Sequence, residues 1–357
     1  MSQSTRYEGL DALRGIAALM VVWFHTWVFN RLTLPDWLTP FVKHFGLGVQ
    51  MFFILSAFCL CIGYHHRLRS PDEIKHFAVR RFFRIAPLFY LLIPIWIAIE
   101  YFKRSQATSL YEVILNLTFL FNVPPAPTLS IVWAGWTIGI EMMAYVIFPL
   151  AIILMSTLRR TAVALLTSVL VAFAFQVSIA GQDLPRGYGW QSLTAQTPFF
   201  VLGILCWQLF RAIEQHPYRL LIGNSLLVLT FIYWLALAAS GLASFQTAGV
   251  PVYKYLISIG FAPLILSQVL APARWIVNPA TIYLGIRGYS VYLLHPIVVL
   301  FSIPFIRQSI YGGEQAGHLW PFIVSCTMIS AMVILASHWS YKWIEIPGQR
   351  LGLKKRQ

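Results

Sequence analysis

The chain has 357 residues, of which 58% are hydrophobic and only 11% are charged. A soluble globular protein carries about 25% charged residues because they cover its surface, so this composition excludes a soluble domain, a disordered chain and a coiled coil. The mean hydropathy is +0.70, and apolar runs of about 20 residues, long enough to cross a bilayer as an α-helix, recur throughout. We therefore predict an all-α, polytopic membrane protein.

Ten apolar stretches are predicted to cross the membrane. They cover residues 10–30, 45–64, 85–102, 131–155, 161–180, 194–211, 219–240, 253–271, 279–303 and 319–341. A further apolar segment, Leu110–Phe121, is about a dozen residues long and too short to cross. We expect it to re-enter the membrane or to lie at its surface. Residues 1–357 are expected to form one transmembrane domain without an appended soluble domain.

The basic residues predict the topology. The net charge of +14 comes from 26 Lys and Arg residues against 12 Asp and Glu. In a membrane protein, Lys and Arg concentrate on the cytoplasmic side, and with ten spans most of them fall there if the N-terminus is inside. We therefore expect both termini to be cytoplasmic in a multi-pass protein of the plasma (bacterial inner) membrane, with no nucleic-acid partner. The four cysteines lie in apolar runs and are expected to pack as small apolar side chains rather than as disulfides.

The first span carries two ionisable side chains on one face. Arg14 and His25 are eleven residues apart, which is within about 20° of whole helical turns and about 16 Å along the axis. Ionisable side chains inside a bilayer are costly and are therefore functional candidates. We expect an anionic ligand to enter past Arg14 and His25 to act as a base on its far end. The alternative is that Arg14 anchors the topology and His25 is a packed polar residue.

A basic segment precedes the third span. Its six cationic residues are Arg67, Arg69, Lys75, Arg80, Arg81 and Arg84. On a helix the last three, which we call the arginine cluster, would crowd one surface. Guanidinium groups bind phosphate through paired hydrogen bonds, so the arginine cluster is predicted to bind a polyanion. Contact with anionic lipid head groups is the alternative.

The fourth span has a polar stripe. Thr137, Glu141 and Tyr145 are spaced by four and share one face of an otherwise apolar helix. Glu141 is the acidic residue that we place well inside a span, and we expect it to face a cavity or a cationic partner such as Arg14, Arg287 or a protonated histidine. An ordinary structural hydrogen bond is the alternative interpretation of the stripe.

The ninth span adds Tyr292 and His295, three residues apart on one helical face. Each could serve as an internal structural hydrogen bond. Taken with Arg14, His25 and Glu141, however, they make a set of intramembrane polar residues distributed over three spans. Such a set favours a functional site over isolated packing interactions.

In their order along the chain, these motifs resemble those of the acyltransferase 3 family of integral membrane acyltransferases. The matching residues are Leu10-Asp11-Ala12-Leu13-Arg14-Gly15, the Arg14-to-His25 spacing, Gly46-Leu47-Gly48-Val49 with Phe52-Phe53, Arg81-Phe82-Phe83-Arg84 as an Arg-x-x-Arg pair, Trp136 with Glu141, Tyr292-Leu293-Leu294-His295, and Trp343-Ile344-Glu345-Ile346-Pro347. The chain departs from the family pattern at Ala57, Thr137 and Met142, where glycine, serine and a second acid are usual.

The resemblance implies a carbohydrate O-acetyltransferase with acetyl-CoA as acyl donor and no metal. Its acceptor would be a hydroxyl of a cell-envelope polysaccharide or glycolipid. The expected catalytic residues are His25, Arg14 and Glu141; the expected donor-binding residues are Arg80, Arg81 and Arg84; the expected acceptor-binding residues are Trp136, Tyr292 and His295.

Two questions stay open at this point. His25 either acts as general base in direct transfer or first takes the acyl group itself. A secondary transporter that uses Arg14, Glu141 and His295 as a proton or substrate relay is the alternative function. The expected partners are acyl-CoA, the carbohydrate or glycolipid acceptor and membrane lipid, and a homodimer is one open assembly state.

Overall fold

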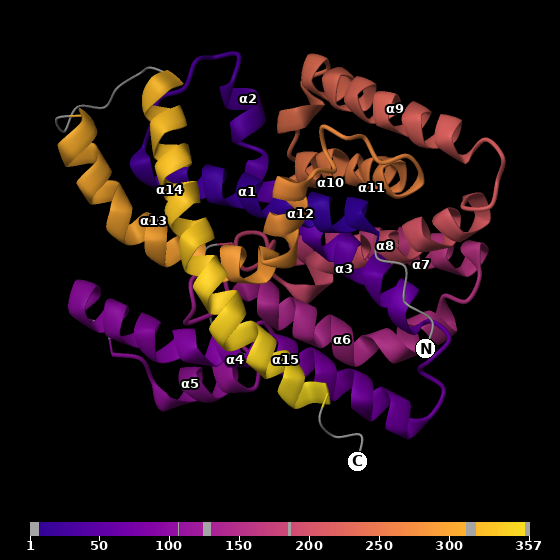
Figure 1. Ribbon diagram of the computed structural model, residues 1–357, viewed down its shortest axis with the longest axis horizontal. Coiled ribbons are helices and arrows are strands. Elements are labelled where there is room, and N and C mark those ends of the chain that lie inside the picture. Colours follow the sequence, from indigo (N-terminus) through magenta and orange to yellow (C-terminus); the bar gives the residue numbers. More distant parts are fainter. Residues whose placement is uncertain (1–6, 106, 124–129, 185–186, 312–318, 354–357) are drawn as a thin grey trace. The chain divides into compact units, whose positions relative to one another are not determined.

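Helices dominate the structure of this chain (Figure 1). The computed structural model describes residues 7–105, 107–123, 130–184, 187–311 and 319–353. In these ranges ten helical segments are long and apolar enough to cross a membrane: Glu8–Asn30, Thr39–Tyr64, Pro71–Lys103, Trp136–Leu154, Leu158–Ser178, Leu193–Ile213, Arg219–Ala239, Val252–Leu270, Gly288–Ile310 and Leu319–Leu353. Their number agrees with the prediction, and the chain is an all-α, multi-pass membrane protein.

The third span begins earlier than predicted. Its helix, α4 (Pro71–Arg104), starts at Pro71 and not at residue 85. The Ser70 Oγ accepts a hydrogen bond from the Glu73 N–H at 3.3 Å, and the Glu73 carboxylate accepts one from the Ser70 N–H at 3.2 Å. Such a capping box, followed by proline at the first helical position, fixes a helix start. The arginine cluster therefore lies on a helix.

The predicted ninth span, 279–303, is wrong in its boundaries. The chain forms a short helix, α12 (Pro279–Ile286), and a long one, α13 (Gly288–Tyr311), with Arg287 between them. Only α13 is among the candidate spans of the described residues. Because a charged side chain inside the apolar core of a membrane is costly, a break at Arg287 separates the cation from the apolar helix.

The short apolar segment before residue 121 forms α5 (Leu110–Leu117). It begins in a second capping box, in which Ser109 and Glu112 bond each other's backbone N–H groups. Its eight residues rise about 12 Å, well short of a bilayer. The segment therefore does not cross, as its length in the sequence predicts.

The chain divides into two compact units, each assembled from separate stretches of sequence. Unit 1 consists of Met1–Phe52, Pro217–Phe245 and Tyr253–Tyr341, and unit 2 consists of Phe53–His216, Gln246–Val252 and Lys342–Gln357. The helix α3 (Gly48–Tyr64) begins in unit 1 and continues into unit 2.

Unit 1 is organised around the helix α1 (Glu8–Asn30). This helix packs against α11, α12, α13 and α14, and α9 packs against α11. In Figure 1, α13 and α14 run side by side. The remaining elements of this unit are α2 (Thr39–Val42), η1 (Phe45–Leu47), α9 (Arg219–Ala239), η2 (Leu242–Ser244), α10 (Val252–Ile259), α11 (Phe261–Leu270) and α14 (Leu319–Ser340).

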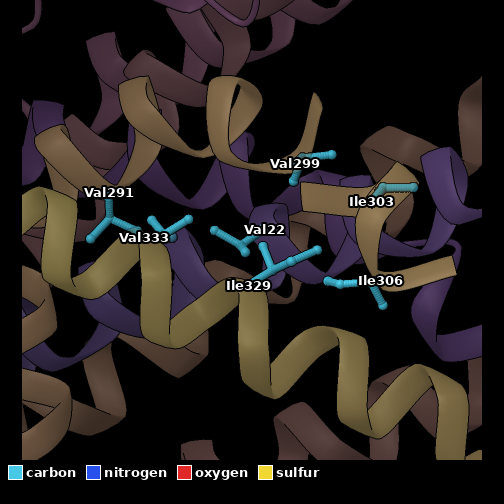
Figure 2. Packing of buried hydrophobic residues seen from close by; sticks show 8 residues of the cluster. Val22, Val291, Val299, Ile303, Ile306, Ile329 and Val333 are labelled. Carbon is cyan, nitrogen blue, oxygen red and sulfur yellow. The ribbon is translucent and has the colours of Figure 1, made fainter. Parts of the chain in front are cut away.

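Branched aliphatic side chains fill the interface of α1, α13 and α14. Figure 2 shows this cluster of buried residues, which comprises Ala18, Val22, Val291, Val299, Ile303, Ile306, Ile329 and Val333. Lipid is as apolar as these side chains, so their association rests on close packing rather than on removal from water. The cluster thereby holds α1 and α13, which carry His25 and His295, in a fixed register.

Glycine allows α1 and α12 to approach closely. A Cβ atom added at Gly285 would lie 1.7 Å from the carbonyl oxygen of Asp11, and one at Gly15 would lie 2.3 Å from that of Thr281. No side chain fits at these distances. Small residues at helix crossings are typical of membrane proteins because they bring backbones into van der Waals contact.

Unit 2 packs α4 against α5 and α6, α6 and α7 against α8, and α4 against α15. Its remaining elements are α6 (Trp136–Leu154), α7 (Leu158–Ser178), α8 (Leu193–Ile213), the π-helical turn η3 (Tyr341–Glu345), which begins at the last residue of unit 1, and α15 (Ile346–Leu353). A Cβ atom added at Gly348 of α15 would lie 2.8 Å from the carbonyl oxygen of Phe83 on α4. This contact sets α15 directly against the helix that carries the arginine cluster.

Candidate active site

Two histidines of unit 1 contact each other. His25 comes from α1 and His295 from α13, and the Nδ1 of His25 lies 3.1 Å from the Nε2 of His295. Their ring centroids are 4.9 Å apart with an interplanar angle of 38°. His295 is fully buried, whereas His25 is partly buried. We call the two residues the histidine pair.

Main-chain carbonyls fix the proton positions in the histidine pair. The Nδ1 of His295 faces the carbonyl oxygen of Tyr292, and the Nδ1 of His25 lies 2.9 Å from that of Val21. A carbonyl oxygen can only accept, so each Nδ1 carries the hydrogen in the neutral ring. The Nε2 of His295 then accepts from the Nδ1–H of His25. In this tautomer the Nε2 of His25 holds the lone pair and is the atom that can take a proton.

Aromatic rings surround the histidine pair. Phe29 stacks on His25 with centroids 6.1 Å apart, and Phe24 meets it edge-on at 5.2 Å. Tyr292 packs against His295 at 5.6 Å and against Phe52 at 5.9 Å. These rings leave His25 few alternative rotamers. A fixed imidazole suits a group that must meet a reacting atom in one geometry.

Arg14 lies on the same uninterrupted helix as His25, as predicted. Its Nη1 donates a hydrogen bond to the Asp11 carboxylate at 3.2 Å. The start of α13 lies close by, because a Cβ atom added at Gly288 would be 3.9 Å from the Cβ of Arg14. The neighbouring Arg287 is placed against the ring of Tyr283, with its guanidinium carbon 3.6 Å from the centroid. Unit 1 thus gathers two cations at this end of α1.

Unit 2 contains Glu141 and the arginine cluster of the predicted site. The Glu141 carboxylate accepts hydrogen bonds from the hydroxyl of Ser56, at 2.9 Å, and from that of Tyr145. Arg81 interacts electrostatically with Glu141 and Tyr145, and its Nη2 donates to the Tyr64 hydroxyl at 3.1 Å. We call these five residues the carboxylate cluster. A carboxylate inside a membrane protein requires such partners, because an unpaired charge is costly there.

One member of the arginine cluster, Arg81, also belongs to the carboxylate cluster. The guanidinium of Arg81 lies 5.1 Å from the ring centroid of Tyr64 and 5.7 Å from that of Tyr145, and its Nε is buried without a hydrogen-bond partner. All three arginines of the arginine cluster keep part of their surface exposed, and the guanidinium of Arg80 also lies 5.4 Å from the Tyr64 ring centroid. Within unit 2, the cation beside Glu141 is Arg81, which the sequence assigns to the donor.

Trp136 begins α6 and lies at the edge of unit 2's aromatic packing. Its ring is 6.3 Å from that of Phe53, and its carbonyl oxygen accepts from the Asn122 amide at 2.6 Å. Thr137 donates to the Ala134 carbonyl oxygen at 3.3 Å. Of the predicted polar stripe, Glu141 and Tyr145 are therefore bonded to each other, whereas Thr137 contacts the main chain.

Ser56 and Tyr64 are two members of the carboxylate cluster that were not predicted from the sequence. Both lie in α3, an apolar helix in which a hydroxyl is a conspicuous exception, and that exception is the signal available in the sequence. The four cysteines are free thiols, as predicted, and three of them are buried. Among the described residues, no group of three His, Cys, Asp or Glu side chains that could hold a metal ion is found.

Comparison with known proteins identifies the family. A family model described as an acyltransferase domain matches residues 7–337 of the chain. The chain belongs to the acyltransferase 3 family. This match confirms the resemblance and the prediction that the chain is an acyltransferase, and it favours the enzyme over the transporter.

Named relatives are similar to the chain at low identity. A candidate acetyltransferase of the Acidianus two-tailed virus is 26% identical, over 79% of this chain and 80% of its own length. A candidate O-acetyltransferase of Staphylococcus aureus is 25% identical over 97% of this chain, and the peptidoglycan O-acetyltransferase OatA of Listeria monocytogenes is 22% identical over 99%. The chain spans 58% of the length of the last two relatives. No solved structure matches it.

Proposed function

We propose that this chain is an O-acetyltransferase that moves an acetyl group from acetyl-CoA to a hydroxyl of a cell-envelope carbohydrate or glycolipid. Family membership and the names of the relatives support O-acetyl transfer. The single observation that carries the catalytic assignment is the hydrogen bond between His25 and His295. Together with the main-chain carbonyls that each Nδ1 faces, it leaves His25 in the tautomer that has a basic Nε2.

In the proposed reaction, the Nε2 of His25 takes the proton of the acceptor hydroxyl as that oxygen attacks the thioester carbonyl. The new C–O ester bond forms, the C–S bond breaks, and the CoA sulfur leaves with the bonding electron pair. The imidazolium of His25 then returns its proton to that thiolate. The products are the acetyl ester and free CoA, and the histidine ends neutral.

His295 acts in this scheme as a positioning residue. Its Nε2 accepts from the Nδ1–H of His25, and its own Nδ1–H is held by the Tyr292 carbonyl oxygen. When His25 becomes an imidazolium, its Nδ1–H becomes a stronger donor, so this hydrogen bond strengthens as the transition state forms. The assignment of His295 to acceptor binding is replaced by this role.

The donor would be bound by cations. Arg80 and Arg84 retain exposed surface for the phosphates of CoA, and Arg14 would guide the anionic donor toward His25. Arg81, held beside Glu141, would orient that carboxylate and keep Tyr145 in place. The partly exposed ring of Trp136 would pack against a sugar acceptor, whose C–H groups are apolar, whereas the buried Tyr292 would act through its contact with His295.

The family match at residues 7–337 takes in segments of both units, so we propose that they act as one acyltransferase domain. The excess of basic residues on one side supports cytoplasmic termini in the plasma membrane, with the acyl-CoA taken from the cytosol. Cysteine-labelling of single-cysteine variants in intact cells tests this orientation. Labelling of both ends from outside the cell would contradict it.

The test of function uses purified full-length protein in lipid nanodiscs. We expect free CoA to be released from acetyl-CoA when an envelope-glycan acceptor is present, and the acceptor to gain an acetyl ester detectable by mass spectrometry. Without acceptor, direct transfer predicts no acetylated protein after the donor is added. An acetylated His25 would replace direct transfer by a two-step reaction, and no CoA release under any condition would contradict the proposed function.

A further inference from the structure

Unit 2 contains a cavity of about 420 Å³ that the proposed chemistry does not use. Side chains from three separated segments line it, among them His65, His66, Ser156, Trp207, Gln208 and Arg211. Its volume is within the range of small-molecule sites, about 300–1,000 Å³. We call it the α8 cavity, after the helix that carries Trp207, Gln208 and Arg211.

One side of the α8 cavity is aromatic. The ring of His65 lies 4.4 Å from that of Trp207 and 3.4 Å from that of His66, measured between centroids. The Nδ1 of His65 lies 2.9 Å from the Cys61 carbonyl oxygen, which fixes its ring. Burial lowers the pKa of His65, and the neighbouring charges of His66, Arg211 and Arg69 lower it further. Because its ordinary pKa is already below 7, His65 is a neutral flat ring at pH 7.

Gln208 and Arg211 supply polar side chains to the α8 cavity. The Gln208 amide nitrogen donates to the Met155 carbonyl oxygen at 2.7 Å, which fixes the amide orientation. Its Oε1 is buried and has no hydrogen-bond partner. A ligand with an N–H or O–H donor at this place would satisfy that oxygen. The Arg211 side chain is 54% exposed and pairs with Glu214 through one nitrogen, which leaves further guanidinium N–H groups for an anion.

The α8 cavity lies among equivalent ends of alternate spans. His65 follows the second candidate span, Ser156 follows the fourth, and Arg211 lies in the last turn of the sixth. Successive spans alternate in direction, so these three ends share one side of the membrane. Arg67, Arg69, Arg159 and Arg160 belong to the same connections, which makes this the basic side and, by charge bias, the cytosolic one.

A ligand for such a cavity needs a flat ring, an amino donor and a phosphate. We propose that the α8 cavity binds the adenosine 3′-phosphate end of the CoA donor, an inference that rests on the proposed function. The adenine ring would stack on Trp207 beside His65, its amino group would donate to the Gln208 Oε1, and Arg211 would bind the 3′-phosphate. Bases stack on aromatic side chains irrespective of their identity, whereas the phosphate supplies selectivity.

A lining residue of the α8 cavity is adjacent in sequence to a contact of the arginine cluster. His65 directly follows Tyr64, whose hydroxyl accepts from the Arg81 Nη2 at 3.1 Å. A nucleotide at His65 would therefore place its pyrophosphate near the cations of α4. The donor would be held at its nucleotide end by residues distinct from those that act on the thioester.

The experiment measures inhibition by adenosine 3′,5′-bisphosphate against acetyl-CoA with the full-length protein in nanodiscs. Trp207→Ala should weaken inhibition about ten-fold or more, since loss of base stacking has that order of effect. Trp207→Phe should retain most of it. Trp275→Ala removes an exposed tryptophan of unit 1 as a matched control and should leave inhibition unchanged. Equal inhibition constants in the wild type and in a folded Trp207→Ala would overturn the proposal.

Arg211→Gln tests the phosphate contact and leaves the aromatic side chains of the α8 cavity in place. We expect this variant to bind adenosine 3′,5′-bisphosphate about as weakly as adenosine 5′-monophosphate, whereas the wild type should prefer the bisphosphate. Retention of the wild-type preference in Arg211→Gln would overturn the phosphate assignment. Intrinsic tryptophan fluorescence reports direct binding in both proteins.

Acetyl-pantetheine, a donor without the nucleotide, separates this proposal from the proposed function. If the α8 cavity is the nucleotide site, the Trp207→Ala protein should show a raised KM for acetyl-CoA and an unchanged KM for acetyl-pantetheine. An equal rise for both donors would overturn the cavity assignment. A wild type that uses neither donor would instead contradict the proposed function, while fluorescence titration with the bisphosphate would still decide whether the cavity binds a nucleotide.

Discussion

The histidine pair of unit 1 and the carboxylate cluster of unit 2 differ in how their polar side chains are stabilised inside a membrane protein. The histidine pair is held by a chain of neutral hydrogen bonds that ends at the main-chain carbonyls of Val21 and Tyr292. The carboxylate cluster instead sets the charge of Glu141 near that of Arg81 and surrounds both with hydroxyl groups. The first arrangement orients an imidazole, and the second places a carboxylate near a guanidinium group.

The largest expected effect is that of His25→Ala. Loss of a general base lowers the rate by about 10²–10⁴-fold, so acetyl transfer should fall to the detection limit in a CoA-release assay, while insertion and the thermal unfolding temperature stay near those of the wild type. His216→Ala, which changes an exposed histidine, is the control. Full activity of His25→Ala would remove the base assignment and leave His25 as a packed polar residue.

Glu141→Gln tests whether the carboxylate cluster works through charge. This variant keeps the shape of the side chain but removes the partner of Arg81, and we expect turnover to fall roughly 10- to 150-fold, the size of a lost charge-assisted interaction. Expression should remain near normal. Glu100→Gln on α4 serves as a matched control. Turnover at the wild-type level would show that only the hydrogen-bonding shape of residue 141 matters.

The Glu141→Gln change and an Arg81→Met change should not be additive. If the two side chains act as a pair, the double variant should lose little more activity than either single variant, because the second change removes a partner already lost. A double-mutant cycle on kcat measures this coupling. Strictly multiplicative losses would place Arg81 with the donor-binding residues, where the sequence puts it.

Arg84→Ala is expected to act on donor binding rather than on turnover. Arg84 is partly exposed, so its loss should cost about 10-fold in the KM for acetyl-CoA, the lower end of the range for a charge-assisted contact. The kcat should change little. An unchanged KM for acetyl-CoA would indicate that Arg84 serves the membrane topology or contacts lipid.

The smallest effect is expected for His295→Gln. Glutamine can present its amide oxygen where the Nε2 of His295 accepts, so it should retain most of the kcat. His295→Leu should lower the kcat roughly 2- to 12-fold, the worth of one net hydrogen bond, since Val21 still accepts from His25. The KM for acetyl-CoA should be unchanged in both. Equal kcat values for the two variants would show that His295 only fills space.

The sequence predicted the fold well because hydropathy is a local property. Ten spans follow from run lengths alone, and the start of α4 could have been placed from Ser70-Pro71-Asp72-Glu73, a capping box with proline at the first helical position. The break at Arg287 was missed because apolar runs on both sides of it mask the charge. Hydropathy does not record where one helix ends and the next begins within such a run.

The contacts of the site were less predictable because they join distant parts of the chain. Arg14 and His25 could be assigned to one face since both lie on one helix. The partner of His25 is 270 residues away, and the spacing of Tyr292 and His295 indicates a shared face without naming what it meets. The cationic neighbour of Glu141 depends in the same way on how α4 packs on α6, which no periodicity within either helix specifies.

Mass spectrometry of envelope glycans tests the central claim most directly. Cells that lack the protein would be complemented with the wild type, with His25→Ala or with His216→Ala, at matched membrane levels. We expect O-acetyl esters on one class of envelope glycan with the wild type and with His216→Ala, and their absence with His25→Ala. Glycans that carry the same esters in all three strains, or in none of them, would contradict it.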